Sequence, residues 1–111
     1  MRLERIFGYN LRQRLDDLRP TYKFDVSCQG TVPPALIAFL ESSGYEDAVR
    51  KAISLGGDAD TLACITGAVA EAYDGGVPAY IATRTLAALD DRLRGVVLQF
   101  GRRFGLPSGN H

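Results

Sequence analysis

Apolar residues recur with helical spacing through most of this chain, and this pattern restricts it to an all-α fold. The clearest stretch lies near the C-terminus, where the spacing predicts one helix over residues 86–104. Its apolar positions are Leu86, Leu89, Leu93, Val96, Val97, Phe100 and Phe104. The chain is therefore expected to form a compact bundle of about five to six helices, because each apolar stripe must be buried against another element.

The remaining helices follow from the same periodicity and from start and stop residues. In chain order the predicted helices are 3–18, 33–42, 46–55, 60–73, a short one begun by Pro78, and 86–104. Pro33 and Pro34 suit a first helical turn, and Gly56 suits a left-handed cap. Residues 21–31 lack a helical period and are expected to form a loop with an extended piece at 22–26.

Composition narrows the class of protein. The chain has 111 residues, enough for one helical domain over 1–111 with a polar tail at 105–111. Thirteen basic and thirteen acidic residues cancel, which argues against nucleic acid or an anionic membrane as the main partner. No apolar run reaches membrane-spanning length and the N-terminus is too charged for a signal peptide, so a cytoplasmic location is expected.

Cysteine and histidine are scarce. Cys28 and Cys64 lack a C-x-x-C spacing, and His111 is the only histidine, so neither a zinc site nor a histidine-dependent triad is expected. Cys64 is predicted to pack as a small apolar residue.

The segment Gly56–Thr61 concentrates the polar chemistry of the chain. Asp58, Asp60 and Thr61 offer only oxygen ligands, which hard divalent cations such as Mg²⁺ prefer, and the preceding glycines allow a sharp turn. A second interpretation is structural: Asp58 caps the following helix, and the other two residues occupy its first turn. The spacing alone leaves both interpretations open.

Two blocks of sequence resemble the ADP-ribosylglycohydrolase family. The longer one is AVRKAISLGGDADTLACITGAVAEAY over residues 48–73, continuing to Pro78, and it is similar to the family's C-terminal segment. The other comprises FDVSCQGTVP over residues 24–33 and ALIAFL over 35–40. Both blocks occur in the family's order.

The resemblance implies an all-helical fold that holds two Mg²⁺ ions, with Mn²⁺ as an alternative. Asp58, Asp60 and Thr61 match the family's C-terminal metal ligands, with Asp60 expected to bridge the ions. The substrate would be an ADP-ribosylated molecule or a small ADP-ribose conjugate, cleaved at the glycosidic bond. Weak candidates for contacting it are Cys28, Gln29, Gly30 and Gly57; alternatively, the segment 27–31 is an ordinary connector.

The chain departs from the family in one respect. The family's Thr-Asp-Asp ligands and its catalytic acidic residue belong to an N-terminal part, and no Thr-Asp-Asp occurs here. The pairs Asp16-Asp17 and Asp90-Asp91 are expected to be solvent-exposed. We therefore expect a hydrolase segment that is inactive alone and acts with a complementary chain, or a non-catalytic helical interaction module; a homo-oligomer is the alternative assembly. No catalytic residue is predicted.

Overall fold

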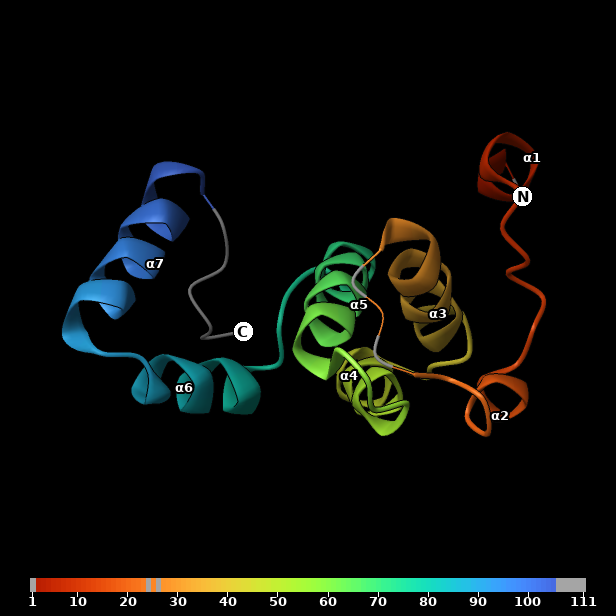
Figure 1. Ribbon diagram of the computed structural model, residues 1–111. Coiled ribbons are helices and arrows are strands. Elements are labelled where there is room, and N and C mark those ends of the chain that lie inside the picture. Colours follow the sequence, from red (N-terminus) through yellow and green to blue (C-terminus); the bar gives the residue numbers. More distant parts are fainter. Residues whose placement is uncertain (1, 24, 26, 106–111) are drawn as a thin grey trace. The chain divides into compact units, whose positions relative to one another are not determined.

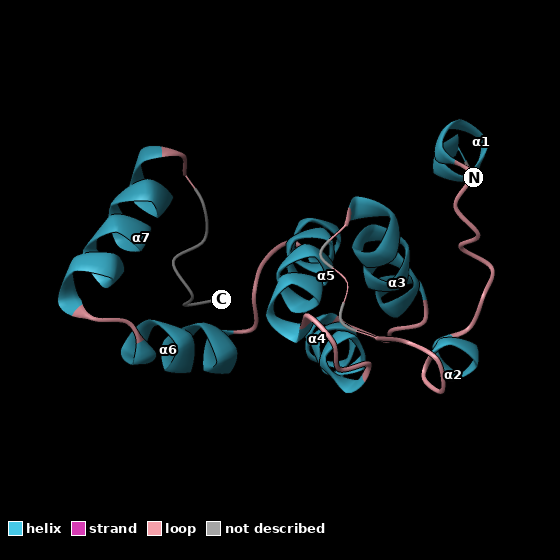
Figure 2. Ribbon diagram, viewed as in Figure 1, coloured by secondary structure: helices cyan, strands magenta, loops and turns pink. Residues whose placement is uncertain are grey.

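The computed structural model describes residues 2–23, 25 and 27–105, and within them it contains seven α-helices and no strand (Figures 1 and 2). The prediction of an all-α fold is confirmed. Contacts divide the chain into two units, Met1–Ala72 and Tyr73–His111. A single domain over 1–111 stays a prediction, and His111 and most of the predicted tail lie outside the described residues.

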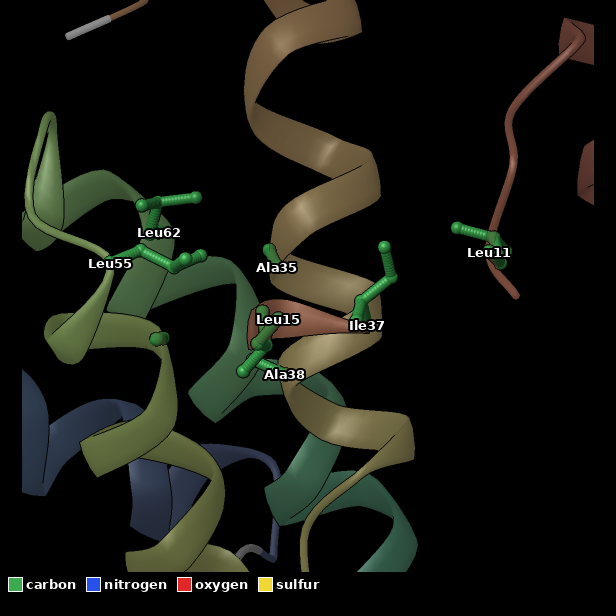
Figure 3. Close-up of a cluster of buried hydrophobic side chains, with 8 residues drawn as sticks. Leu11, Leu15, Ala35, Ile37, Ala38, Leu55 and Leu62 are labelled. Carbon is green, nitrogen blue, oxygen red and sulfur yellow. The ribbon is translucent and has the colours of Figure 1, made fainter. Parts of the chain in front are cut away.

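The first unit has a core made mainly of leucine, isoleucine and alanine. Its helices are α1 (Arg2–Phe7), α2 (Leu15–Leu18), α3 (Cys28–Leu40), α4 (Tyr45–Ser54) and α5 (Ala59–Asp74), the last of which ends just beyond the unit. Helix α3 packs against α2 and α4. Leu15, Ile37 and Leu62 are almost fully buried (Figure 3). The buried Thr66 hydroxyl donates to the Ala35 carbonyl at 2.9 Å, which ties α5 to α3.

The predicted helix 3–18 is wrong, because the chain breaks it into α1 and α2. Gly8 has a φ of +71° and its N–H donates to the Glu4 carbonyl at 2.9 Å, so α1 ends there. The Glu4 carboxylate then accepts the Leu11 N–H at 3.1 Å, and Asn10 accepts the Arg12 N–H at 3.2 Å. Side-chain acceptors thus replace the helical carbonyls across this turn.

Helix α3 begins at Cys28, five residues before the predicted start, so the predicted loop is wrong for residues 28–31. Ser27 is the N-cap, and its hydroxyl accepts the Gly30 N–H at 3.0 Å. Pro34 has no N–H for the Gly30 carbonyl, which instead accepts the Tyr22 hydroxyl at 3.2 Å. A side chain therefore compensates for a proline inside the helix. The predicted extended piece lies partly outside the described residues, which omit 24 and 26.

Helices α4 and α5 lie within one residue of their predicted bounds, and Gly56 has the predicted left-handed φ, at +76°. Asp16, Asp17, Asp90 and Asp91 are exposed, as predicted. Cys64 is also exposed, so its predicted packing as a core residue is wrong.

The second unit contains α6 (Ala79–Ala88) and α7 (Asp91–Arg103). Pro78 is the N-cap of α6, so the predicted helix begun by Pro78 is confirmed. The predicted single helix over 86–104 is wrong, because residues 86–88 belong to α6 and a turn at 89–90 precedes α7. Asp90 is the N-cap of α7 and accepts the Leu93 N–H at 2.8 Å. Arg94 donates to the carbonyls of Leu86 at 2.8 Å and Leu89 at 2.5 Å. It therefore adds a charged donor to the carbonyls at the end of α6. Neither α6 nor α7 buries a residue.

In the part of the chain that the structure describes, no helix is long and apolar enough to cross a membrane.

Candidate metal and substrate site

The turn between α4 and α5 presents the predicted metal ligands. Gly56 and Gly57 both have positive φ, at +76° and +62°, which reverses the chain direction directly after α4. The Asp58 carbonyl accepts the Leu62 N–H at 3.0 Å, so Asp58 stands at the N-cap position of α5. Asp60 and Thr61 follow in the first turn, and both are exposed, whereas Asp58 is half-buried.

The side chain of Asp60 interacts with that of Asp58. The pKa of Asp60 is lowered, first by the hydrogen bond with the Asp58 side chain and then by the Thr61 N–H, which donates to Asp60 Oδ1 at 2.9 Å. Asp58 and Asp60 are two residues apart in one turn, and carboxylate oxygens are the ligands that Mg²⁺ prefers, so this donor set fits part of a magnesium shell.

The described residues supply only part of such a shell. Among them, no group of three or more histidine, cysteine, aspartate or glutamate side chains is arranged to hold a metal ion. With Thr61, the segment offers three side chains that carry oxygen, and an octahedral ion would need water or another segment for its remaining ligands.

Tyr22 connects this turn to the start of α3. A Cβ on Gly57 would lie 2.8 Å from Tyr22 Cε2, so the ring packs directly against the glycine backbone. The hydroxyl of the same ring donates to the Gly30 carbonyl. The pKa of Tyr22 is raised, first by burial and then by the negative charges of Asp25 and Asp58. The two blocks singled out in the sequence therefore meet at one aromatic ring.

Asp25 organises the first turn of α3. Its Oδ1 accepts the N–H of Ser27 at 2.7 Å and the hydroxyl of Ser27 at 2.6 Å, and these bonds lower the Asp25 pKa, the hydroxyl bond contributing most. The Thr31 hydroxyl donates to the Asp25 carbonyl at 3.0 Å. A Cβ on Gly30 would collide with the Asp25 carboxylate, so residue 30 must lack a side chain in this arrangement.

A cleft of about 370 Å³ opens beside Tyr22. Its lining combines apolar and polar residues. The lining residues are Gln13, Leu18, Thr21, Tyr22, Lys23, Asp25, Gln29, Gly30, Pro33, Pro34 and Ile37. Of the four weak candidates for substrate contact, Gln29 and Gly30 line this cleft. Cys28 is exposed on the first turn of α3, and Gly57 lies behind the Tyr22 ring; neither is in the lining.

Comparison with known proteins now decides the family. The sequence profile described as ADP-ribosylglycohydrolase matches residues 3–108, nearly the whole chain. The chain belongs to the ADP-ribosylglycohydrolase family. Members are metal-dependent glycohydrolases that act on ADP-ribosylated substrates. Comparisons with curated proteins and with solved structures give no match.

Sequence analysis missed Tyr22 and Asp25 as parts of this site. The Asp25-x-Ser27 spacing is a signal that could have indicated the cap of α3, because both residue types favour helix starts. Nothing in the sequence around Tyr22 indicated its contact with Gly57, which depends on tertiary packing.

Proposed function

We propose that this chain supplies the Asp58, Asp60 and Thr61 ligands of a magnesium-dependent site that hydrolyses the glycosidic bond of ADP-ribosyl conjugates. The observation that carries the proposal is the turn at Gly56 and Gly57, which places the oxygen-bearing side chains of Asp58, Asp60 and Thr61 together at the start of α5. Family membership makes an ADP-ribosyl substrate the expected one. Mn²⁺ is the alternative cation.

Magnesium bound there would orient the ribose hydroxyls and an attacking water near the anomeric carbon. The chain's own residues position the metal ligands and contact the substrate. The glycine turn, against which Tyr22 packs, places Asp58 at the start of α5, and hydrogen bonds with Asp58 and the Thr61 N–H lower the pKa of Asp60 below its ordinary value. We assign Gln29 and the Gly30 backbone, which line the neighbouring cleft, to contacts with the ADP-ribose.

A second segment is needed to complete the reaction. It would carry the Thr-Asp-Asp ligands, which this sequence lacks, and the acidic group that assists departure of the acceptor. Reaction geometry held by two ions depends on both sets of ligands, so this chain alone should release no ADP-ribose. We place the assembled enzyme in the cytoplasm and treat residues 1–111 as one functional domain.

Titration calorimetry with Mg²⁺ and with Mn²⁺ tests the metal site on the full chain. We expect weak binding, with a dissociation constant of about 0.1–1 mM, because most of the ion stays hydrated. Asp60→Asn, which keeps the shape and removes the charge, should abolish it. Asp74→Asn, at the exposed far end of α5, is the matched control and should bind as the wild type does. Tight binding that survives Asp60→Asn would place the ligands elsewhere.

Activity is tested by adding an N-terminal segment of a family member that contains Thr-Asp-Asp. Metal-dependent release of ADP-ribose should appear only in the mixture, and Asp58→Ala or Asp60→Asn should remove it. Robust release by the 111-residue chain alone would disprove the requirement for a second segment.

A non-catalytic interaction module is the second candidate function. Neither α6 nor α7 contains a buried residue. This favours an interaction module, because helices of this kind expose apolar surface that a partner can cover. A confirmed complex that binds no metal and hydrolyses no conjugate would support this alternative.

A further inference from the structure

Helix α7 carries a continuous stripe of exposed apolar side chains. Leu93, Val97, Phe100 and Phe104 are spaced four, three and four residues apart, which is the spacing of one side of a helix that packs against another helix. Val96 widens the stripe, and these five side chains are between 41% and 59% exposed. The rings of Phe100 and Phe104 lie 4.7 Å apart between centroids, so they form one continuous surface.

Basic side chains border this stripe. Arg92 and Arg103 are eleven positions apart, about three helical turns, so both lie along the edge next to Val96. The Arg103 guanidinium also lies 5.2 Å from the centre of the Phe104 ring. Arg94 borders the other edge but is engaged with the Leu86 and Leu89 carbonyls and with Asp91. The edge formed by Arg92 and Arg103 is therefore positively charged and complements a partner of negative charge.

Gly101 lies beside the stripe on the edge away from Arg103. A Cβ at Gly101 would meet no atom within 4 Å, so internal packing does not explain the glycine. A missing side chain at this position lets the backbone of a neighbouring helix approach closely.

We propose that the α7 stripe binds an apolar helix bordered by acidic side chains, carried by the segment that completes the metal site. This inference rests on the proposed function for the identity of that segment. The surface chemistry expected of the partner segment follows from the apolar stripe, from the border formed by Arg92 and Arg103, and from the missing side chain at Gly101.

Two other occupants fit less well. In an antiparallel pair of α7 helices from two copies, Arg92 of one copy would lie next to Arg103 of the other, so like charges would meet. A lipid surface has negative charge but no shape that matches the gap at Gly101. An apolar helix with acidic borders has the opposite charge to Arg92 and Arg103 and can also approach closely at Gly101.

Fluorescence anisotropy tests the proposal on the full chain. The probe is a labelled N-terminal segment of an ADP-ribosylglycohydrolase, the part that contains Thr-Asp-Asp. We expect Phe100→Asp to weaken binding about tenfold or more, because it places a charge in the centre of the stripe. Arg103→Glu should weaken binding about threefold to tenfold, with the larger effect at low salt.

Arg102→Glu is the matched control, because it makes the same charge reversal one residue away, on the side of α7 opposite the stripe. It should bind the probe as the wild type does. Circular dichroism of every variant verifies that the helices persist. Equal binding by the wild type, Phe100→Asp and Arg103→Glu would overturn the proposal.

Other results would assign the stripe to a different occupant and would also overturn it. One is concentration-dependent dimerisation of the chain alone that Phe100→Asp abolishes. Another is binding to phosphatidylserine vesicles that Arg103→Glu abolishes. A third is hydrogen exchange in which Phe100→Asp deprotects residues of the first unit, since the chain itself would then cover α7.

Failure of this proposal and failure of the proposed function are distinguishable. Asp60→Asn should bind the probe normally and lose only hydrolysis. Phe100→Asp should lose the probe and keep the weak magnesium binding of the chain alone.

Discussion

The carboxylate of Asp25 occupies the space in which a side chain on Gly30 would begin. The carboxylate cannot simply rotate away, because it holds the Ser27 N–H and hydroxyl at 2.7 and 2.6 Å. The start of α3 therefore depends on the absence of one methyl group.

Gly30→Ala should destabilise the chain by about 1–3 kcal/mol, because the new methyl group forces the Asp25 carboxylate off Ser27. Urea unfolding followed by circular dichroism measures the loss. Gly95→Ala is the control, since Gly95 also lies inside a helix and a Cβ there meets no atom within 4 Å. Combining Gly30→Ala with Asp25→Ala should cost less than the sum of the single changes, because the collision is then relieved. Full additivity would show that the two residues do not interfere.

Thr66→Val should destabilise the chain by about 1–2 kcal/mol. It keeps the shape of a fully buried side chain and removes the hydroxyl that donates to the Ala35 carbonyl at 2.9 Å. The exposed Thr83 on α6 provides the control, and Thr83→Val should change the free energy of unfolding by less than about 0.5 kcal/mol. Equal effects at the two positions would mean that the hydrogen bond contributes little.

Acid should remove a stabilising contribution from Asp47. Its pKa lies below the ordinary value of 3.8, first because Lys51 Nζ donates to it, at 2.9 and 3.0 Å, and then because the Ser43 N–H does. A carboxyl whose pKa is lower in the folded state than in the unfolded state stabilises the fold at pH values above the unfolded-state pKa. This stabilisation is lost as the pH falls through the folded-state pKa.

Asp47→Asn should therefore lower the midpoint of thermal unfolding near neutral pH, and the difference from wild type should shrink below pH 3.8. Asp74→Asn changes an exposed aspartate and is the control. It should leave the midpoint of thermal unfolding nearly unchanged both near neutral pH and in acid. A difference for Asp47→Asn that stays constant into acid would contradict this account.

Arg94→Ala should loosen the end of α6. The guanidinium donates to the Leu86 and Leu89 carbonyls, and without it these groups lose a charged donor, at a cost of about 1–3 kcal/mol locally. Hydrogen exchange across residues 79–103 should become faster. Arg94→Lys should restore only part of the protection, because one ammonium cannot copy the guanidinium fork. Unchanged exchange in Arg94→Ala would disprove the capping role.

Periodicity predicted the helices whose boundaries are set by local residues. The helices α4 and α5 are separated by Gly56 and Gly57, and glycine is the usual residue at such a boundary, so their bounds were predicted within one residue. The turn that carries Asp58 and Asp60 was predicted for the same reason. Their role as metal ligands stays a prediction, since the resemblance to the family and not the spacing favours it.

Errors arose where side chains replace backbone partners over several residues. The stripe from Leu3 to Leu18 continues through Gly8, but the Glu4 carboxylate and Asn10 hold a turn there. Pro33 and Pro34 resembled a helix start, although Tyr22, distant in sequence from Pro34, supplies the missing donor. Asp90 interrupts the last stripe by capping α7, and periodicity alone does not detect a cap. The position of Tyr22 beside Gly57 depends on tertiary packing and could not be predicted from local sequence.

The paired prolines of α3 also have a dynamic consequence. Neither Pro33 nor Pro34 has an amide hydrogen, so two successive rungs of the helical ladder, those to the carbonyls of residues 29 and 30, are missing. The first turn is held mainly by side chains from outside the helix, whereas residues 35–38 are fixed in the core. This turn has fewer backbone hydrogen bonds than the rest of α3, so its local stability depends on Tyr22, Asp25 and Ser27 and not on the helical ladder.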